Sequence, residues 1–164
     1  MKIWTKAVTC GLAALALSGV PAPAAGLATK PTLTLDVVKQ LVAAAEKMAV
    51  ANKWNMWIVV VDDGGNTQYV ERLDEAQLGS FDVATAKARG ALMFKRPTKE
   101  FEDQLTGGRT ALLKIPNAMP VEGGVPLMAD GKIIGAIGVS GGTSQQDGQV
   151  AKAGADALAA IAKK

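Results

Sequence analysis

Two turn signals, each lying between strand-like segments, constrain the fold of this chain more than any other feature. The apolar run at residues 56–62 continues into Asp-Asp-Gly-Gly-Asn, and residues 67–73 then resume the strand pattern. Farther along, residues 124–129 and 132–140 flank Asp130-Gly131, a dipeptide typical of the two-residue turn of a β-hairpin. Because short turns join antiparallel neighbours, the sequence predicts two hairpins within an antiparallel sheet.

Four further segments have helical periodicity or a capping residue at their start. They cover residues 34–52, 81–95, 99–105 and 144–164. Thr34 and Ser80 are expected to cap the first two helices, and the third begins after Thr98. Ser144 and Asp147 form a capping-box pattern at the start of the last helix. The order α-β-β-α-α-β-β-α predicts an α/β (α+β) fold with a single antiparallel sheet flanked by helices.

The amino terminus has the three-part pattern of a secretory signal peptide. Lys2 and Lys6 form a basic start, an apolar run follows, and small residues then supply cleavage sites after Ala25 or Ala28. The apolar run is shorter than the about 20 residues that a membrane-spanning helix needs. We therefore expect residues 1–28 to be a signal peptide with no stable membrane anchor. The remaining chain, 29–164, is expected to be a single secreted or periplasmic domain.

Removal of the signal peptide changes what the charge and the cysteine content mean. It leaves 16 basic against 15 acidic residues, a net charge of +1, and it removes Cys10, the only cysteine. A nearly neutral chain with few aromatic residues lacks the basic face of a nucleic-acid-binding protein.

The chain also has no histidine, which excludes Ser-His-Asp and Cys-His catalysis and ordinary zinc sites. Asp-Asp-Gly-Gly-Asn lacks the ligand spacing of an EF-hand, so we interpret it as a turn and expect no metal site.

The stretch from Val121 to Gly142 is rich in glycine although its apolar residues are strand formers. Glycine weakens a strand interior, so its presence indicates a special backbone conformation or a close approach by another group. Strand alternation places Ile134 and Gly138 on one face and Gly135 and Ile137 on the other. The pattern indicates close helix packing on one face and a shallow recess on the other.

Charged residues near this stretch are the candidates for ligand contact. Gly123-Gly124 has the features of a turn with exposed N–H groups. We expect a pocket between this turn, the end of the first hairpin and the second helix, where Arg72, Lys87 and these amides bind a carboxylate. Lys87 lies among alanines, and composition alone favours a solvated side chain, so both interpretations stay open. Arg96 is a further candidate for anion binding, and Glu122 is the candidate general base if the protein is an enzyme.

Four segments resemble the GlcG/HbpS-like family, also called the domain of unknown function 336. They are residues 59–76, 80–98, 121–142 and 147–158, and they occur in the family's order across nearly all of 33–162. The resemblance implies a profilin-like fold around an antiparallel sheet and assembly as a homo-oligomer. Some members are similar to secreted haem-binding and redox-sensing proteins, and others to the C-terminal domain of a cobalamin adenosyltransferase. Others lie beside glycolate-utilisation enzymes.

Haem is the cofactor that the resemblance implies. Histidine cannot bind it here, because the chain has none. An iron ligand would come from Tyr69, from a methionine such as Met93 or Met119, or from a hydroxyl such as Thr98 or Thr110. The leading hypothesis is a secreted small-ligand-binding protein that binds haem or another tetrapyrrole without a histidine ligand. The alternatives are an enzyme acting on a small carboxylate or carbonyl compound, and an oligomeric scaffold for a partner.

Overall fold

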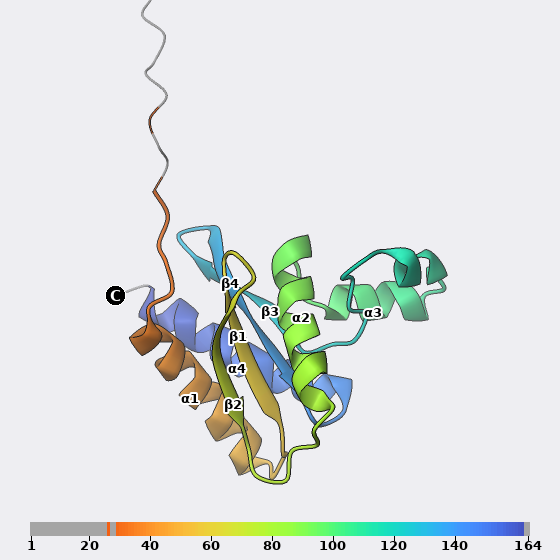
Figure 1. Cartoon of the computed structure of the whole chain (residues 1–164), viewed down its shortest axis with the longest axis horizontal. Helices are drawn as coiled ribbons and strands as arrows, with labels where there is room; N and C mark the ends of the chain where they lie inside the picture. The colour runs from red at the N-terminus through yellow and green to blue at the C-terminus, as the bar shows by residue number, and fades with distance from the viewer. Residues whose placement is uncertain (1–25, 27–28, 163–164) are drawn as a thin grey trace, which may run out of the picture.

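The described part of the chain folds around one four-stranded antiparallel sheet (Figure 1). The computed structural model describes Gly26 and residues 29–162, so the predicted signal peptide lies outside the described residues apart from Gly26. The strands are β1 (Trp57–Asp62), β2 (Thr67–Arg72), β3 (Gly124–Ala129) and β4 (Lys132–Ser140), in the order β2-β1-β4-β3. The helices are α1 (Leu35–Ala51), α2 (Ser80–Phe94), α3 (Lys99–Thr106) and α4 (Ser144–Ile161), with a 3-10 helix at Thr110–Lys114. Both predicted hairpins and the α+β fold are confirmed.

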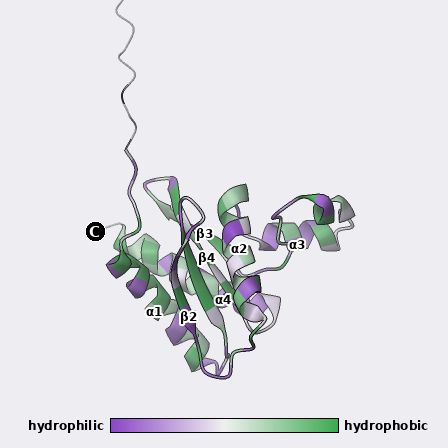
Figure 2. Ribbon diagram, viewed as in Figure 1, coloured by the Kyte–Doolittle hydropathy of each residue, from purple (hydrophilic) through white to green (hydrophobic). Residues whose placement is uncertain are grey.

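Helices cover both faces of the sheet, and each face buries its own apolar cluster. α1 and α4 pack together on one face over residues such as Ile58, Val60 and Ile137, whereas α2 covers Val59 and Val61 on the other (Figure 1). β1 is apolar along its length because it is buried on both faces. Figure 2 shows this hydrophobic interior along the central strands. Within the described residues, no helix combines the length and apolar character needed to cross a membrane.

Two paired glycines explain how α2 approaches the sheet. Gly124 on β3 and Gly138 on β4 are direct cross-strand partners. A Cβ atom on Gly138 would lie 2.0 Å from the carbonyl oxygen of Ala84, and one on Gly124 would lie 2.2 Å from that of Lys87. The backbone of α2 therefore rests directly on the sheet backbone. This confirms the predicted close helix packing at Gly138 and gives a physical reason for the glycine-rich sequence.

The strand alternation predicted for β4 is wrong near its start. The pairing of β3 with β4 shifts between Leu127 and Met128, so that Ile134 has no direct partner in the register. Such a bulge adds one residue and changes the face to which the neighbouring side chain points. Ile134 consequently packs in the same cluster as Ile137. On the face of Gly135 there is no recess of the kind expected for one face of this strand, because Leu33 Cδ1 lies 2.5 Å from where a Cβ atom on Gly135 would be.

Of the predicted helix starts, only the first has the predicted cap. The side chain of Thr34 accepts the N–H of Val37. The cap position of α2 is Gly79, and buried Ser80 instead accepts a hydrogen bond from the Gln77 side chain. The capping box of α4 lies one residue earlier than predicted: the Thr143 and Gln146 side chains bond to each other's backbone N–H groups. Asp147 is thereby left free for another role.

Candidate functional site

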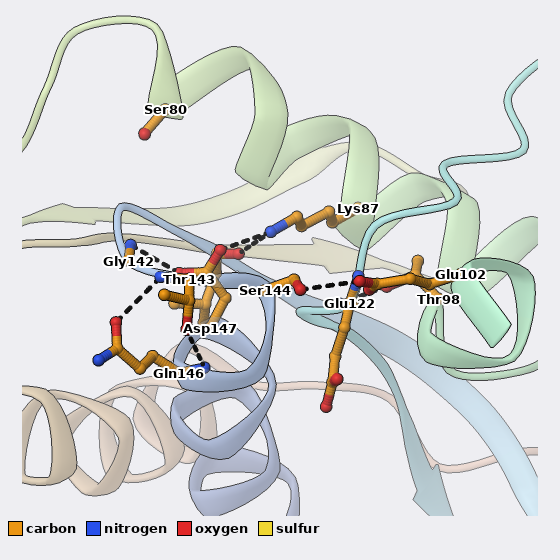
Figure 3. Close-up of polar contacts among 12 residues, drawn as sticks. Ser80, Lys87, Thr98, Glu102, Glu122, Gly142, Thr143, Ser144, Gln146 and Asp147 are labelled. Carbon is orange, nitrogen blue, oxygen red and sulfur yellow. Dashed lines mark hydrogen bonds and ion pairs between the residues drawn. The ribbon is translucent and has the colours of Figure 1, made fainter. Parts of the chain in front are cut away.

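A buried ion pair joins α2 to the start of α4 (Figure 3). Lys87 Nζ lies 2.6 Å from Asp147 Oδ2 and donates a second hydrogen bond to the carbonyl oxygen of Val139 at 3.1 Å. The side chains of Lys87 and Asp147 are only 1% and 3% exposed. The expected solvated side chain at Lys87 is therefore wrong. The lysine also does not reach a ligand surface, because its ammonium group is used within the fold.

Asp147 is held by the loop before α4 as well as by the lysine. One carboxylate oxygen accepts the N–H of Gly142 at 2.9 Å. Burial raises the pKa of the Asp147 carboxyl above its usual value, and the ammonium group of Lys87 lowers it by a smaller amount. The carboxylate therefore ties the Gly141-Gly142 turn, β4 and α2 together.

The Gly123-Gly124 turn is also built into the fold. The N–H of Gly124 donates to Thr98 Oγ1 at 2.9 Å, and the N–H of Thr98 donates back to the Gly124 carbonyl at 3.0 Å. Thr98 is fully buried; α3 begins directly after it, as predicted, but its side chain makes no capping hydrogen bond. Gly123 has a φ of +128°, a conformation that L side chains rarely adopt. The amide of Gly124 is therefore satisfied internally and is not available to a ligand.

Glu122 lies beside this turn, against the first turns of α4. Its backbone N–H donates to Glu102, whose other carboxylate oxygen accepts the hydroxyl of Ser144 at 2.8 Å (Figure 3). The Glu122 carboxylate itself points away from Glu102 and lies against Gly148, where a Cβ atom would come within 2.1 Å of Oε1. Burial raises the pKa of Glu122, the Lys99 ammonium lowers it, and Glu102 and Asp103 raise it.

A pocket of about 330 Å³ opens next to Glu122, and we call it the Glu122 pocket. Its lining residues come from α3, β3 and α4 and the segments before them: Pro97, Lys99, Glu122, Gly123, Gly124, Val125, Gly148, Lys152, Ala155 and Asp156. Of the predicted site residues, the consecutive residues Glu122, Gly123 and Gly124 line this pocket. The cations at this pocket are Lys99 and Lys152, which sequence reasoning missed because they lie 53 residues apart and only the tertiary structure brings them to one pocket.

The two predicted arginines lie elsewhere. Arg72 ends β2, the edge strand opposite β3, where its guanidinium bonds the Ala76 carbonyl and stacks 5.2 Å from the Trp57 ring centroid. Arg96 pairs loosely with Glu100 at 3.7 Å and lies over the ring of Phe101. Neither lines the Glu122 pocket. The single pocket expected for Arg72, Lys87 and the glycine amides is therefore wrong. Arg72 lies on the far edge strand, and Lys87, although it lies beside Gly123, is buried.

A larger pocket of about 790 Å³ lies where the tips of both hairpins meet the end of α2, and we call it the hairpin-end pocket. Its lining residues are Lys30, Asp63, Gly64, Gly65, Arg89, Leu92, Met93, Lys95, Met128, Gly131, Lys132 and Ile133. At its edge, the carboxylate of Asp62 accepts the N–H groups of Gly64 and Asn66, and the Asn66 N–H bond is the largest influence lowering its pKa. These bonds confirm the turn predicted from Asp-Asp-Gly-Gly-Asn.

The candidate iron ligands are scattered over the molecule. Only Met93 lines the hairpin-end pocket, whereas Met119 lines a smaller pocket of about 160 Å³. The hydroxyl of Tyr69 bonds to Glu71 on the edge strand, and burial raises its pKa. Thr98 is buried against Gly124, and Thr110 is exposed at the start of the 3-10 helix. Met93 is thus the candidate that combines exposure with a large cavity.

Comparison with known proteins gives one consistent result. A family model described as "Haem degrading protein HbpS-like" matches residues 33–156. Protein GlcG of Escherichia coli K12 is 41% identical over 112 residues, which cover 68% of this chain and 84% of GlcG.

Two solved structures share this fold and are also similar to this chain in sequence. A double mutant of HbpS from Streptomyces reticuli has a TM-score of 0.73 at 33% identity, covering 86% of this chain and 98% of HbpS. A complex of PduOC with haem has a TM-score of 0.70 at 28% identity, covering 77% of this chain and 95% of PduOC. The chain described here belongs to the HbpS-like family.

Proposed function

We propose that this protein is a secreted small-ligand-binding protein that binds haem or another tetrapyrrole in the hairpin-end pocket. One observation carries the proposal: the wall of this pocket combines apolar and thioether side chains with four cationic side chains, of which Lys30 is paired with Asp63. The apolar part contains Leu92, Met93, Met128 and Ile133, and the cationic part contains Lys30, Arg89, Lys95 and Lys132. The haem complex of the related PduOC supports the same class of ligand.

The residues of this pocket fit the chemistry of haem. A tetrapyrrole has a large apolar face and carboxylates at its edge, and charge-assisted bonds from lysine and arginine suit such carboxylates. Met93 is more than half exposed, so its thioether would be accessible to a haem iron without refolding. Lys95 follows the last residue of α2 and has a φ of 55°, the left-handed conformation common at helix C-termini. It lines the pocket at this end of the helix.

The protein's own residues would hold and orient the group. Haem, when bound, would supply a redox-active iron whose potential depends on the residue that binds it. Met93 would bind the iron, Leu92 and Ile133 would exclude water from the ring, and Arg89 and Lys132 would hold the carboxylates. Arg89 is already positioned by the first hairpin, because its Nε donates to the Gly65 carbonyl at 3.1 Å.

Replacement of Met93 tests this assignment. We expect wild-type protein titrated with haemin to give a saturable Soret band, and Met93→Leu to shift the band and weaken binding at least about tenfold. Leucine keeps the apolar volume but removes the sulfur ligand. Met48→Leu is the matched control, because Met48 is a partly exposed methionine on α1, far from this pocket. Equal spectra and affinities for Met93→Leu and Met48→Leu would contradict Met93 as the ligand.

Export and assembly are part of the same proposal. The basic start, apolar run and small residues within residues 1–28 support cleavage of a signal peptide. We expect N-terminal sequencing of exported protein to begin at Gly26 or Thr29, and sedimentation of that material to give a homo-oligomer. Exported protein that begins at Met1 would contradict the processing, and a clean monomer at micromolar concentration would contradict the assembly.

A further inference from the structure

We infer that the Glu122 pocket is a second binding site, independent of the hairpin-end pocket, and that its ligand is a small zwitterion. The chemical class is an α-amino acid with a short aliphatic side chain. Four charged side chains line the pocket, two cationic and two anionic. A ligand with one charge of each sign can satisfy such a lining without bringing net charge into it.

The two cations are arranged on different helices that face the same space. Lys99 begins α3 and Lys152 lies in α4. Each is oriented by an aspartate one turn later: Lys99 Nζ lies 2.7 Å from Asp103, and Lys152 Nζ lies 2.6 Å from Asp156. An ammonium group has three donors, so each lysine can keep its aspartate and still bind a ligand carboxylate. Lys99 and Lys152 therefore form the carboxylate-binding side.

Glu122 is a pocket carboxylate that lacks a direct partner. Its carboxylate has no ion-pair or hydrogen-bond partner among the residues that the structure describes, although it is only partly exposed. Carboxylates withdrawn from water are normally compensated by a positive charge or by hydrogen-bond donors. The ammonium group of an amino acid supplies both. An anionic ligand without a donor would leave the Glu122 carboxylate without a direct partner and add repulsion.

Gly148 provides the space in which this carboxylate lies. Glycine within a helix is less favourable than alanine by about 1 kcal/mol. A structural constraint at position 148 of α4 would explain why glycine occurs there. Here a Cβ atom would come within 2.1 Å of Glu122 Oε1 and 2.6 Å of its Cδ. Glycine at this position therefore lets the Glu122 side chain lie flat against α4 at the edge of the pocket.

The remaining wall sets the size of the ligand. Pro97, Val125 and Ala155 form an apolar surface between the charged groups. The volume of about 330 Å³ lies at the lower end of the range for small-molecule pockets. A side chain of one to three carbon atoms can pack on this surface while its backbone charges bind Glu122 and the lysines.

Isothermal titration of the full-length mature protein with L-alanine, propionate and propylamine tests the inference. We expect L-alanine to bind at least about tenfold more tightly than propionate or propylamine, which each retain only one of its two charges. Glu122→Gln and Lys152→Met should each weaken L-alanine binding at least about tenfold, as expected for loss of one charge-assisted contact. Glu100→Gln and Lys47→Met are the matched controls, because both residues are exposed and lie outside the pocket.

Gly148→Ala gives a second test that does not alter a charged group. Its Cβ should displace the flexible Glu122 side chain and weaken L-alanine binding without unfolding the protein, as circular dichroism would show. Propionate that binds as tightly as L-alanine, no binding of L-alanine at millimolar concentration, or unchanged affinity in both Glu122→Gln and Lys152→Met would each overturn the inference. Haemin titration of the same variants should match wild type, so failure at one pocket is distinguishable from failure at the other.

Discussion

Replacement of Lys87 by methionine is expected to lower the free energy of unfolding by about 3–5 kcal/mol, the range for breaking a buried ion pair by removal of one partner. The variant leaves Asp147 only 3% exposed, without the lysine's charge, and with the Gly142 N–H as the hydrogen-bond donor to its carboxylate. Urea unfolding followed by circular dichroism measures the change from the shift in midpoint at an unchanged slope.

The matched control for Lys87 is Lys152, which forms an ion pair of the same length at the surface. Lys152 Nζ also lies 2.6 Å from its aspartate, but both side chains of that pair are more than 60% exposed. Exposed pairs contribute about 0–1 kcal/mol, so Lys152→Met should scarcely change stability. Adding Asp147→Asn to Lys87→Met should recover part of the loss, because asparagine removes the charge and still accepts the Gly142 N–H. Equal effects of Lys87→Met and Lys152→Met would show that burial does not strengthen the pair.

The second large effect is expected at Gly138, where alanine should destabilise the protein by about 3 kcal/mol, the upper end for overpacking. The added Cβ would lie 2.0 Å from the Ala84 carbonyl oxygen and 2.6 Å from the Ala88 nitrogen. Both are backbone atoms of α2, so the clash cannot be relieved by a change of rotamer. The helix would have to move off the sheet, and thermal unfolding would report the loss.

Gly79→Ala is the control for this substitution. Gly79 has a φ of −64°, and a Cβ atom there would meet nothing within 4 Å. Alanine at this position should leave stability unchanged or slightly raise it, because it reduces the entropy of the unfolded chain. A Gly138→Ala protein as stable as the Gly79→Ala protein would contradict the close helix-to-sheet contact.

Local sequence was enough to predict the elements of the fold and their order. Turn chemistry at residues 62–66 and 130–131 acts over a few residues, and helical spacing of apolar residues acts over a few turns. Both hairpins and all four helices therefore formed where these patterns lie. The glycine-rich hairpin also indicated close packing of a helix, which Gly138 confirms.

Local sequence did not predict the capping residues where two neighbouring residues can each cap the same helix. We predicted a capping box of Ser144 with Asp147, but Thr143 with Gln146 also fits the capping-box pattern. The observed cap uses Thr143 and Gln146, because Asp147 is engaged by Lys87, 60 residues away in sequence. Thr98 likewise has a cap residue's chemistry, but its hydroxyl accepts a bond from Gly124 on β3.

The candidate site was the part that only the tertiary structure decided. The sequence pointed to Glu122, Gly123 and Gly124, because glycine pairs are uncommon in a strand-forming stretch. It placed the glycines in one pocket with Arg72 and Lys87. The strand order β2-β1-β4-β3 places Arg72 at the far edge of the sheet, and burial withdraws Lys87 from solvent. A charge's role depends on which groups face it and whether water reaches it, and those are set by contacts between segments far apart in the chain.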